Sequence, residues 1–415
     1  MTLLPALLLA CAGSQKPEPE ALSEPAPTPA PVESSVASGT ITAQPQLSRA
    51  APGPTYSASA TDFALRFHSE LGDGNTAESG VSAQIALSML AAGAAGETLE
   101  EFATAFGADV DDTWHVDQVR AMAAYNDTPG IELTVVNGLW TQQGRPLKEP
   151  YVQRLTSDYL AAPSELDFSA NAAGAADTIN AWTREHTRDR IQKLFDAGDV
   201  QGAELVLANA IAFKGTWETK FDATLTTEDP FSAPTGKVNV PTMHGKIDGL
   251  SYVEGDGFRA IALPYVQRGA AMIVVLPNEG VALADVEAKL DQSQLGRLTM
   301  SGRRPVNVSL PKWQAEYSHD LDAPLRALGL DSAFTGGDFS GMSDRPLKID
   351  SAVQKVFVQV DEEGTEAAAV TGIVMKTTSL PPQPVDFVVD RPFFWAIWHV
   401  ETRTPLFTGR VVDPT

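Results

Sequence analysis

Six histidines are the side chains best suited to acid–base or metal chemistry in this 415-residue sequence. They are His68, His115, His186, His244, His319 and His399. No two of them have the spacing of a metal-binding motif such as His-Glu-x-x-His. The sequence also contains no Gly-x-Ser-x-Gly nucleophile elbow and no glycine-rich phosphate loop. We therefore expect no metal, no cofactor and no catalysis by this chain.

The segment after Val360 suggests a different kind of chemistry, in which the chain changes its own strand pairing. A strand-like run, Val356–Val360, is followed by Asp361-Glu362-Glu363-Gly364-Thr365-Glu366-Ala367-Ala368-Ala369-Val370-Thr371-Gly372. Large side chains disappear in this stretch. A run of Thr, Ala and Gly can form an exposed loop, and it can also enter a packed sheet without a clash. Few segments need to be able to do both.

The alternation of residue types in this segment supports strand formation, because side chains alternate between the two faces of a strand. If Thr365 faces inward, the other inward residues are Ala367, Ala369, Thr371, Ile373 and Met375. Both charged residues of the stretch, Glu366 and Lys376, then face outward. The alternative is an ordinary alanine-rich linker, in which this partition would be accidental.

The elements that would position this segment are of mixed type. Helical spacing of apolar residues predicts helices over 62–71, 82–92, from 97 onward, and over 176–195. Apolar runs predict strands over 133–140, 205–213, 271–276, 306–310, 356–360, 385–389, 393–399 and 406–411. Because the helices come early and the strands late, we expect an α+β fold.

The N-terminal region indicates a lipoprotein. Residues 1–10 are almost entirely apolar, and Leu8-Leu9-Ala10-Cys11 is similar to a bacterial lipobox. Cys11 is the only cysteine, so it is the expected acylation site and the fold contains no disulfide. Residues 1–10 would be a signal peptide and residues 11–55 a disordered tether rich in Pro, Ala and Glu. The alternative is an apolar N-terminus that arose by chance.

The remaining residues, 56–415, are expected to form one large domain. The net charge of −23 argues against nucleic acid or anionic lipid as a partner, although it also serves solubility. We expect a monomer held at the cell envelope by its lipid, at the outer membrane or the cell surface. A secreted, soluble form is the alternative.

An ordered series of motifs resembles the serpin family of serine protease inhibitors. The series comprises Ser79-Gly80-Val81-Ser82, Asn180-Ala181-Trp182, Asn209 to Phe221 including Trp217, Val240-Pro241-Thr242-Met243-His244, Leu263-Pro264-Tyr265, Leu310-Pro311-Lys312, Asp390-Arg391-Pro392-Phe393, and Leu406 to Pro414. The resemblance implies a single serpin domain with a central mixed β-sheet, additional sheets and surrounding helices. It also implies an exposed reactive-centre loop over about 364–384, with a hinge at Glu362, Gly364, Thr365, Glu366, Ala367, Ala368 and Ala369.

The resemblance further implies a mechanism in which a serine protease cleaves the loop and becomes acylated by it. The freed loop would then insert into the central sheet and carry the enzyme with it. The usual loop length places the cleaved bond at Thr378–Ser379, which favours elastase-like or subtilisin-like targets. Cleavage after Lys376 or Thr377 is the alternative, and Lys376 would suit a trypsin-like enzyme.

Two groups of residues are expected to control opening of that sheet. In the first, Lys312 pairs with Glu362 near Trp217, by carry-over of the family motif. In the second, Gln354 stands where the family usually carries a histidine, and its amide is expected to bond toward Ser82 and Asn209.

Two other functions stay open: a non-inhibitory carrier or chaperone of the same family, and a structural surface lipoprotein.

Overall fold

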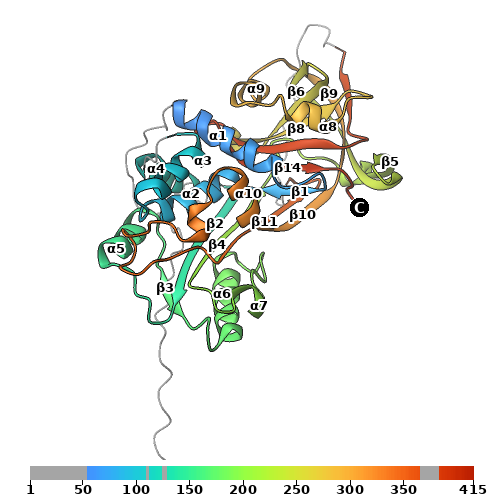
Figure 1. Ribbon diagram of the computed structural model, residues 1–415. Helices are drawn as coiled ribbons and strands as arrows, with labels where there is room; N and C mark the ends of the chain where they lie inside the picture. Colours follow the sequence, from blue (N-terminus) through green and yellow to red (C-terminus); the bar gives the residue numbers. More distant parts are fainter. Residues whose placement is uncertain (1–53, 109–111, 124–128, 365–382) are drawn as a thin grey trace, which may run out of the picture. The chain divides into compact units, whose positions relative to one another are not determined.

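The computed structural model describes residues 54–108, 112–123, 129–364 and 383–415 (Figure 1). These residues form two β-sheets with helices packed around them. The α-helices are α1 Pro54–Ser69, α2 Gly80–Ala91, α3 Gly96–Phe106, α4 Asp112–Ala123, α5 Glu149–Asp158, α6 Ala172–His186, α7 Ala197–Val200, α8 Leu283–Glu287, α9 Gln292–Leu298, α10 Asp322–Ala327 and α11 Ser332–Thr335. The strands are β1 Thr76–Glu78, β2 Ile131–Gln142, β3 Ser164–Leu166, β4 Leu205–Gly215, β5 Thr227–Ala233, β6 Gly236–Gly255, β7 Phe258–Pro264, β8 Ala270–Pro277, β9 Arg303–Pro311, β10 Trp313–Asp320, β11 Ser351–Val360, β12 Val385–Val388, β13 Phe393–His399 and β14 Thr404–Val411.

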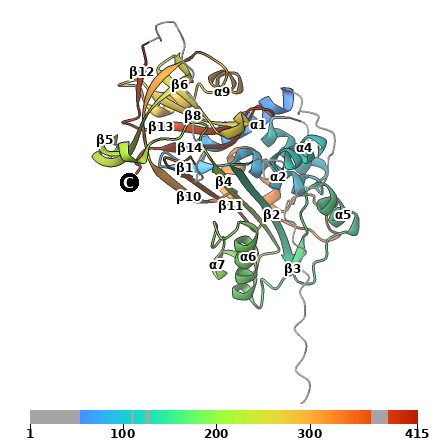
Figure 2. The same ribbon diagram turned by 180° about the vertical axis from the view of Figure 1, so that it is seen from behind.

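The smaller sheet contains five strands in the order β10-β11-β4-β2-β3. β11 and β4 run parallel, whereas β4 and β2 run antiparallel, as do β10 and β11. Both faces of β2 are covered. Leu133 and Val135 belong to the core that includes Val81 of α2, whereas the Trp140 ring meets the Trp182 ring of α6 edge-on at 5.1 Å. Burial on two faces explains why β2 and β4 are nearly continuous apolar runs. Figures 1 and 2 show α6 and α7 beside one end of these strands.

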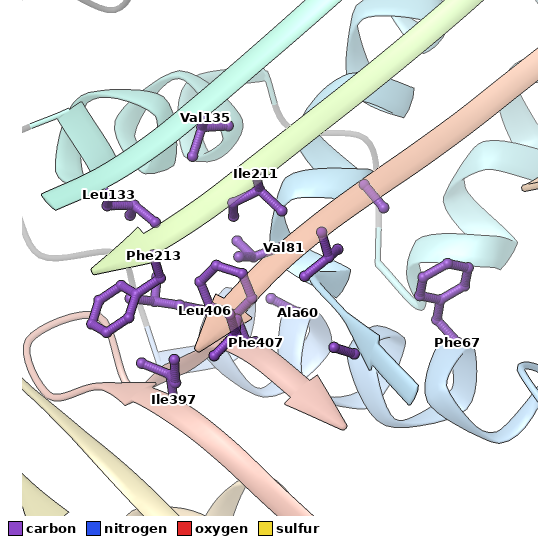
Figure 3. Close-up of a cluster of buried hydrophobic side chains, with 14 of the residues drawn as sticks. Ala60, Phe67, Val81, Leu133, Val135, Ile211, Phe213, Ile397, Leu406 and Phe407 are labelled. Atoms are coloured by element: carbon purple, nitrogen blue, oxygen red, sulfur yellow. The ribbon is translucent and has the colours of Figure 1, made fainter. Parts of the chain in front are cut away.

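The larger sheet contains nine strands, in the order β1-β14-β13-β8-β7-β6-β9-β12 with β5 paired to β6. Every residue of β8, β13 and β14 is buried. Side chains from both sheets meet in one hydrophobic cluster (Figure 3), where Phe213 of β4 lies 5.9 Å, centroid to centroid, from Phe407 of β14. The expected α+β class with a central mixed sheet is confirmed.

One expected helix boundary is wrong. The helix predicted over 176–195 is α6, which ends at His186. Arg188 and Asp189 have positive φ angles of 51° and 60°, which a continuous helix does not allow. The chain then turns back along α6, where the Asn180 amide oxygen accepts hydrogen bonds from the backbone N–H groups of Leu194 and Phe195 at 2.7 and 3.1 Å. The helical spacing of apolar residues in the sequence thus continues past His186, where the helix ends.

Six strands were not expected, namely β1, β3, β5, β6, β7 and β10. Of these, β6 and β10 lack apolar runs in their sequences. β6 carries several glycines and charges, and β10 reads Trp-Gln-Ala-Glu-Tyr-Ser-His-Asp. β10 is the last strand on its side of the five-stranded sheet, where polar side chains are common.

No helix within the described parts of the chain combines the length and apolar character needed to cross a bilayer.

Candidate sheet-opening site

The parallel pairing of β11 and β4 stops before either strand ends. The register runs from Ser351–Val206 to Val358–Phe213, yet β11 continues to Val360 and β4 to Gly215. Beyond the ladder, contact is made through an isolated antiparallel bridge between Thr216 and Gly364. The two strands therefore separate at the end that leads into the segment from residue 365 onward.

An ion pair lies at this end of the sheet, between Lys312 and Glu362. Lys312 Nζ is 2.9 Å from Glu362 Oε2 and donates to Oε1 at 3.1 Å. Thr226 Oγ1 donates to Oε1 at 2.6 Å. Burial would raise the pKa of the Glu362 carboxyl, but the hydrogen bonds from Thr226 and Lys312 lower it below its ordinary value. Glu362 is therefore held as a carboxylate between two donors.

Trp217 fixes the turn that follows β11. Its indole Nε1 donates to the backbone oxygen of Asp361 at 2.9 Å, and its ring stacks on Tyr265 with centroids 4.6 Å apart. The Trp217 backbone N–H donates to the oxygen of Glu363 at 3.1 Å, and Lys220 pairs with the Glu363 carboxylate. The chain between Asp361 and Gly364 is thus held on both sides. We call Trp217, Lys220, Thr226, Lys312, Glu362 and Glu363 the upper cluster.

Gly364 occupies a position that no other residue fits. Its φ of 130° is unusual for residues with a side chain. A Cβ at this position would lie 2.2 Å from the Gly215 oxygen and 2.6 Å from the Trp217 nitrogen. Gly364 therefore lets the chain leave the sheet in close contact with the end of β4.

A second group of polar residues lies lower in the sheet and is buried. Gln354 Nε2 donates to Asn209 Oδ1 at 2.6 Å and to the Ser79 oxygen at 2.9 Å. Its Oε1 accepts from the Ser79 N–H at 2.8 Å. The Asn209 amide donates to Ser82 Oγ at 2.7 Å and to Asn137 Oδ1 at 2.6 Å. We call Ser79, Ser82, Asn137, Asn209 and Gln354 the lower cluster.

One expectation for the lower cluster needs correction. Gln354 bonds Asn209 as predicted, but its other partner is the backbone of Ser79 rather than the Ser82 hydroxyl. The physical reason is the start of α2, where Ser79 is the N-cap and its N–H group is free of the helix ladder. Ser82 is reached through Asn209 instead.

Several expected site residues lie outside the described residues. They are Cys11, Thr365, Glu366, Ala367, Ala368, Ala369, Lys376, Thr377, Thr378 and Ser379. Within the described part, the structure brings together Lys312, Glu362 and Trp217 at one place and Gln354, Asn209 and Ser82 at another.

Other members of both clusters were not predicted from the sequence. Lys220 and Tyr265 lie inside motifs that were recognised, so their place near Trp217 could have been suspected. Ser79 also lies inside a recognised motif, whereas Thr226 and Asn137 carry no such signal, because they make their contacts through tertiary packing across many residues of chain.

Comparison with known proteins agrees with this geometry. A family model described as Serpin (serine protease inhibitor) matches residues 57–414. A serpin-like protein of Thermococcus kodakarensis is 36% identical over 342 residues, which cover 80% of this chain and 79% of that protein. Tengpin, a thermophilic serpin solved in its native state, superposes with a TM-score of 0.78 at 27% identity, covering 90% of this chain and 97% of tengpin. Human thyroxine-binding globulin, solved in complex with thyroxine, superposes with a TM-score of 0.77 at 28% identity, covering 87% of this chain and 99% of the globulin.

Proposed function

Because the chain belongs to the serpin family, we propose that it inhibits serine proteases as a suicide substrate whose cleaved loop inserts between β11 and β4. Members of this family are generally protease inhibitors rather than enzymes. The observation that carries the proposal is the junction itself. The segment of small, alternating residues follows directly from the place where the β11–β4 ladder ends and the strands part.

The strand directions give insertion a driving force. The loop follows the end of β11, so it would have to reverse and enter antiparallel to both β11 and β4. One parallel ladder would be replaced by two antiparallel ones, which are slightly more stable per residue. Roughly a dozen new hydrogen bonds at about 1 kcal/mol net each amount to something on the order of 10 kcal/mol. The uncleaved protein would be a kinetically trapped state.

The upper cluster supports this reading, because it spans the place where insertion would begin. Lys312 and Glu362 connect the start of β10 to the residues after β11, and Trp217 holds the turn. The contacts of Trp217 with Asp361 and Glu363 join the chain after β4 to the chain after β11, so they would have to break before a new strand could enter between these strands. The Lys312–Glu362 pair lies on the β10 side of β11. We propose that the cluster keeps the sheet closed until cleavage releases the loop.

We propose Thr378–Ser379 as the cleaved bond and elastase-like or subtilisin-like enzymes as targets. A small residue ahead of the cleaved bond suits shallow substrate pockets, and Pro381-Pro382 beyond it favours an extended chain. Mass spectrometry of the cleaved protein identifies the bond. Inhibition accompanied by cleavage after Lys376 would replace this assignment.

The test of inhibition is a denaturant-resistant complex with a protease, followed on denaturing gels. Thr365→Arg should convert the inhibitor into a substrate, because the charge would face the sheet interior at the first step of insertion. Glu366→Arg is the matched control, since residue 366 would face outward and inhibition should persist. Absence of any complex across elastase-like, subtilisin-like and trypsin-like enzymes would refute the proposal.

A carrier function is the second candidate. It is favoured by the likeness to thyroxine-binding globulin, which was solved in complex with thyroxine. A carrier would bind a small molecule without forming the covalent complex, so the same experiment separates the two functions. A structural surface lipoprotein would do neither.

We also propose that Cys11 is acylated and anchors the protein in the cell envelope, at the outer membrane or the cell surface. The support is the lipobox-like sequence and the lone cysteine. Cys11→Ser should change both the mass and the membrane fraction of the protein. A secreted, soluble protein would show neither change.

A further inference from the structure

A cationic edge lies next to the residues where the chain returns from the loop. It consists of Arg259 of β7 and of Arg303 and Arg304 at the start of β9. Arg303 and Arg304 are exposed, and none of the three arginines forms an ion pair with a carboxylate among the described residues. This is notable in a chain whose net charge is −23. We call Arg259, Arg303 and Arg304 the arginine edge.

Aromatic rings hold two of these arginines in place. The Arg304 guanidinium lies over the Tyr252 ring, 5.5 Å from its centroid. The Tyr252 ring meets the Phe387 ring of β12 edge-on at 6.4 Å, and Arg259 lies over Phe387 at 5.9 Å. Arg259 also donates to the Asp386 backbone oxygen at 3.3 Å. Because stacking fixes the arginine side chains, less conformational entropy is lost when they meet an anionic partner.

The strand register places this edge beside the end of the loop. β12 runs parallel to β9, with Val385 opposite Val306 (β12 lies near β6 in Figure 2). Arg303 and Arg304 come just before Val306 in β9, and Gln383 and Pro384 come just before Val385 in the neighbouring segment. The two arginines therefore lie beside the residues that lead into β12. Val385 follows Ser379 by six positions, and six extended residues span at most about 20 Å. The Thr378–Ser379 bond therefore lies within about 20 Å of Val385. An enzyme domain about 30 Å across that binds this bond can reach this part of the surface.

Two carboxylates lie near the arginine edge, and both are already engaged. Glu254 accepts a hydrogen bond from the Tyr252 hydroxyl at 2.9 Å, and Asp386 accepts from the Asn307 amide at 2.8 Å. Neither forms an ion pair with the arginines. A hydrogen bond from a neutral group leaves a carboxylate charged, so the three arginines exceed these two carboxylates by one positive charge, whereas the chain as a whole would repel an acidic protein.

We propose that the arginine edge is a docking surface for the target protease, and that it selects enzymes with acidic residues beside the part of the cleft that binds beyond the cleaved bond. This inference rests on the proposed inhibitory function. The arginines would raise the rate of encounter and orient the enzyme before the loop enters its active site. Loop sequence and arginine edge would then set specificity together.

The test measures docking without cleavage. A subtilisin-like protease with an acidic surface beside its cleft is inactivated at its catalytic serine, and its association rate with the full-length protein is measured by surface plasmon resonance. Arg303→Glu/Arg304→Glu should lower this rate about tenfold at low salt and flatten its salt dependence. Arg345→Glu is the matched control. Arg345 is exposed, forms no ion pair with any residue that the structure describes, and precedes β11, whereas the loop follows this strand.

Arg303→Glu alone guards against a folding artefact, because Arg303 makes no side-chain hydrogen bond within the described residues and should still slow association severalfold. Equal rates for wild type, the double variant and Arg345→Glu, or no docking at all, would overturn the inference. Loss of binding to heparin as a probe, with protease docking unchanged, would also overturn it in favour of a polysaccharide site. Covalent complex formation by the wild type is scored separately, so failure of the inhibitory function is distinguished from failure of the docking surface.

Discussion

Lys312 and Glu362 form an ion pair across the end of the five-stranded sheet, with Nζ and Oε2 2.9 Å apart. Lys312 precedes β10, and Glu362 follows β11 by two residues. An exposed ion pair contributes about 1 kcal/mol or less. Glu362, however, is only 12% exposed and also accepts from Thr226, so removal of one partner leaves a poorly solvated charge.

Replacement of Glu362 by Lys should make the protein prone to polymerise. Two cations would face each other where a carboxylate now joins Lys312 and Thr226, and the repulsion would open the end of the sheet. Native gels during mild heating measure this. The control is Glu316→Lys, which removes the β10–β11 pair between Glu316 and Lys355 but leaves the upper cluster intact. Equal polymerisation of both variants and wild type would contradict the role of the pair.

Acid should weaken the same closure. The pKa of Glu362 is lowered below its ordinary 4.5, so its stabilising contribution is complete above about pH 4.5 and is lost as the pH falls through the folded value. We expect wild-type polymerisation to increase on acidification in that range. The Glu362→Gln variant should polymerise more than the wild type above pH 4.5 and should change less on acidification, because the contribution of the carboxylate is already lost. Identical pH profiles for the two proteins would rule out Glu362 as the acid-sensitive group.

Gln354 should make the lower cluster insensitive to pH near neutrality. Its amide donates and accepts within a buried network but does not titrate. Gln354→His should introduce a pH dependence of polymerisation around the ordinary histidine pKa of about 6.5. The measurement compares polymerisation rates of the two proteins on either side of that pH. A sharp transition near pH 6.5 in the wild type would contradict this prediction.

His68 should make global stability depend on alkaline pH. Burial lowers the pKa of its imidazole, but Glu78 and Glu287 outweigh this effect and raise it from 6.5 to about 9. Arg410 Nη2 lies 2.8 Å from Nε2 and opposes the charge, but the buried Glu78 carboxylate lies 2.6 Å from Nδ1 and, together with Glu287, prevails. The stabilisation is complete below pH 6.5 and is lost as the pH rises through about 9.

This contribution is on the order of 2 kcal/mol at pH 7. The thermal unfolding midpoint of the wild type should therefore fall between pH 7 and pH 10. His68→Gln should unfold at a lower temperature at pH 7 and show a smaller decline. A parallel decline in both proteins would assign the effect to other groups.

The sequence predicts those parts of the fold in which local pattern and burial agree. β4, β8, β13 and β14 are buried on both faces, so their apolar runs were found. β10 could not be found in this way, because a polar strand at a sheet edge depends on pairing with β11 rather than on its own composition. The end of α6 was missed because tertiary contacts of Asn180 redirect the chain.

The candidate site was predicted only where a motif carried it. Lys312, Glu362, Trp217, Gln354 and Asn209 stand in recognisable motifs, and the structure places them in the two clusters. The contact between Gln354 and Ser79 joins residues 275 positions apart through backbone atoms, which no residue type reveals. The arginine edge depends on stacking between side chains of four strands, β6, β7, β9 and β12, which no local sequence pattern reveals.

Because β11 and β4 are parallel and part at one end, a force at that end would separate them by peeling, one hydrogen bond at a time, rather than by shear. Force applied at the Val358–Phe213 end loads one cross-strand hydrogen bond after another, because the strands already part there. Each hydrogen bond then breaks separately at a small cost in free energy. A force too small to break all of them at once can therefore still separate the strands. The Gln354–Asn209 bond lies four positions down this ladder, so it acts as a stop that holds a partly peeled sheet from running open.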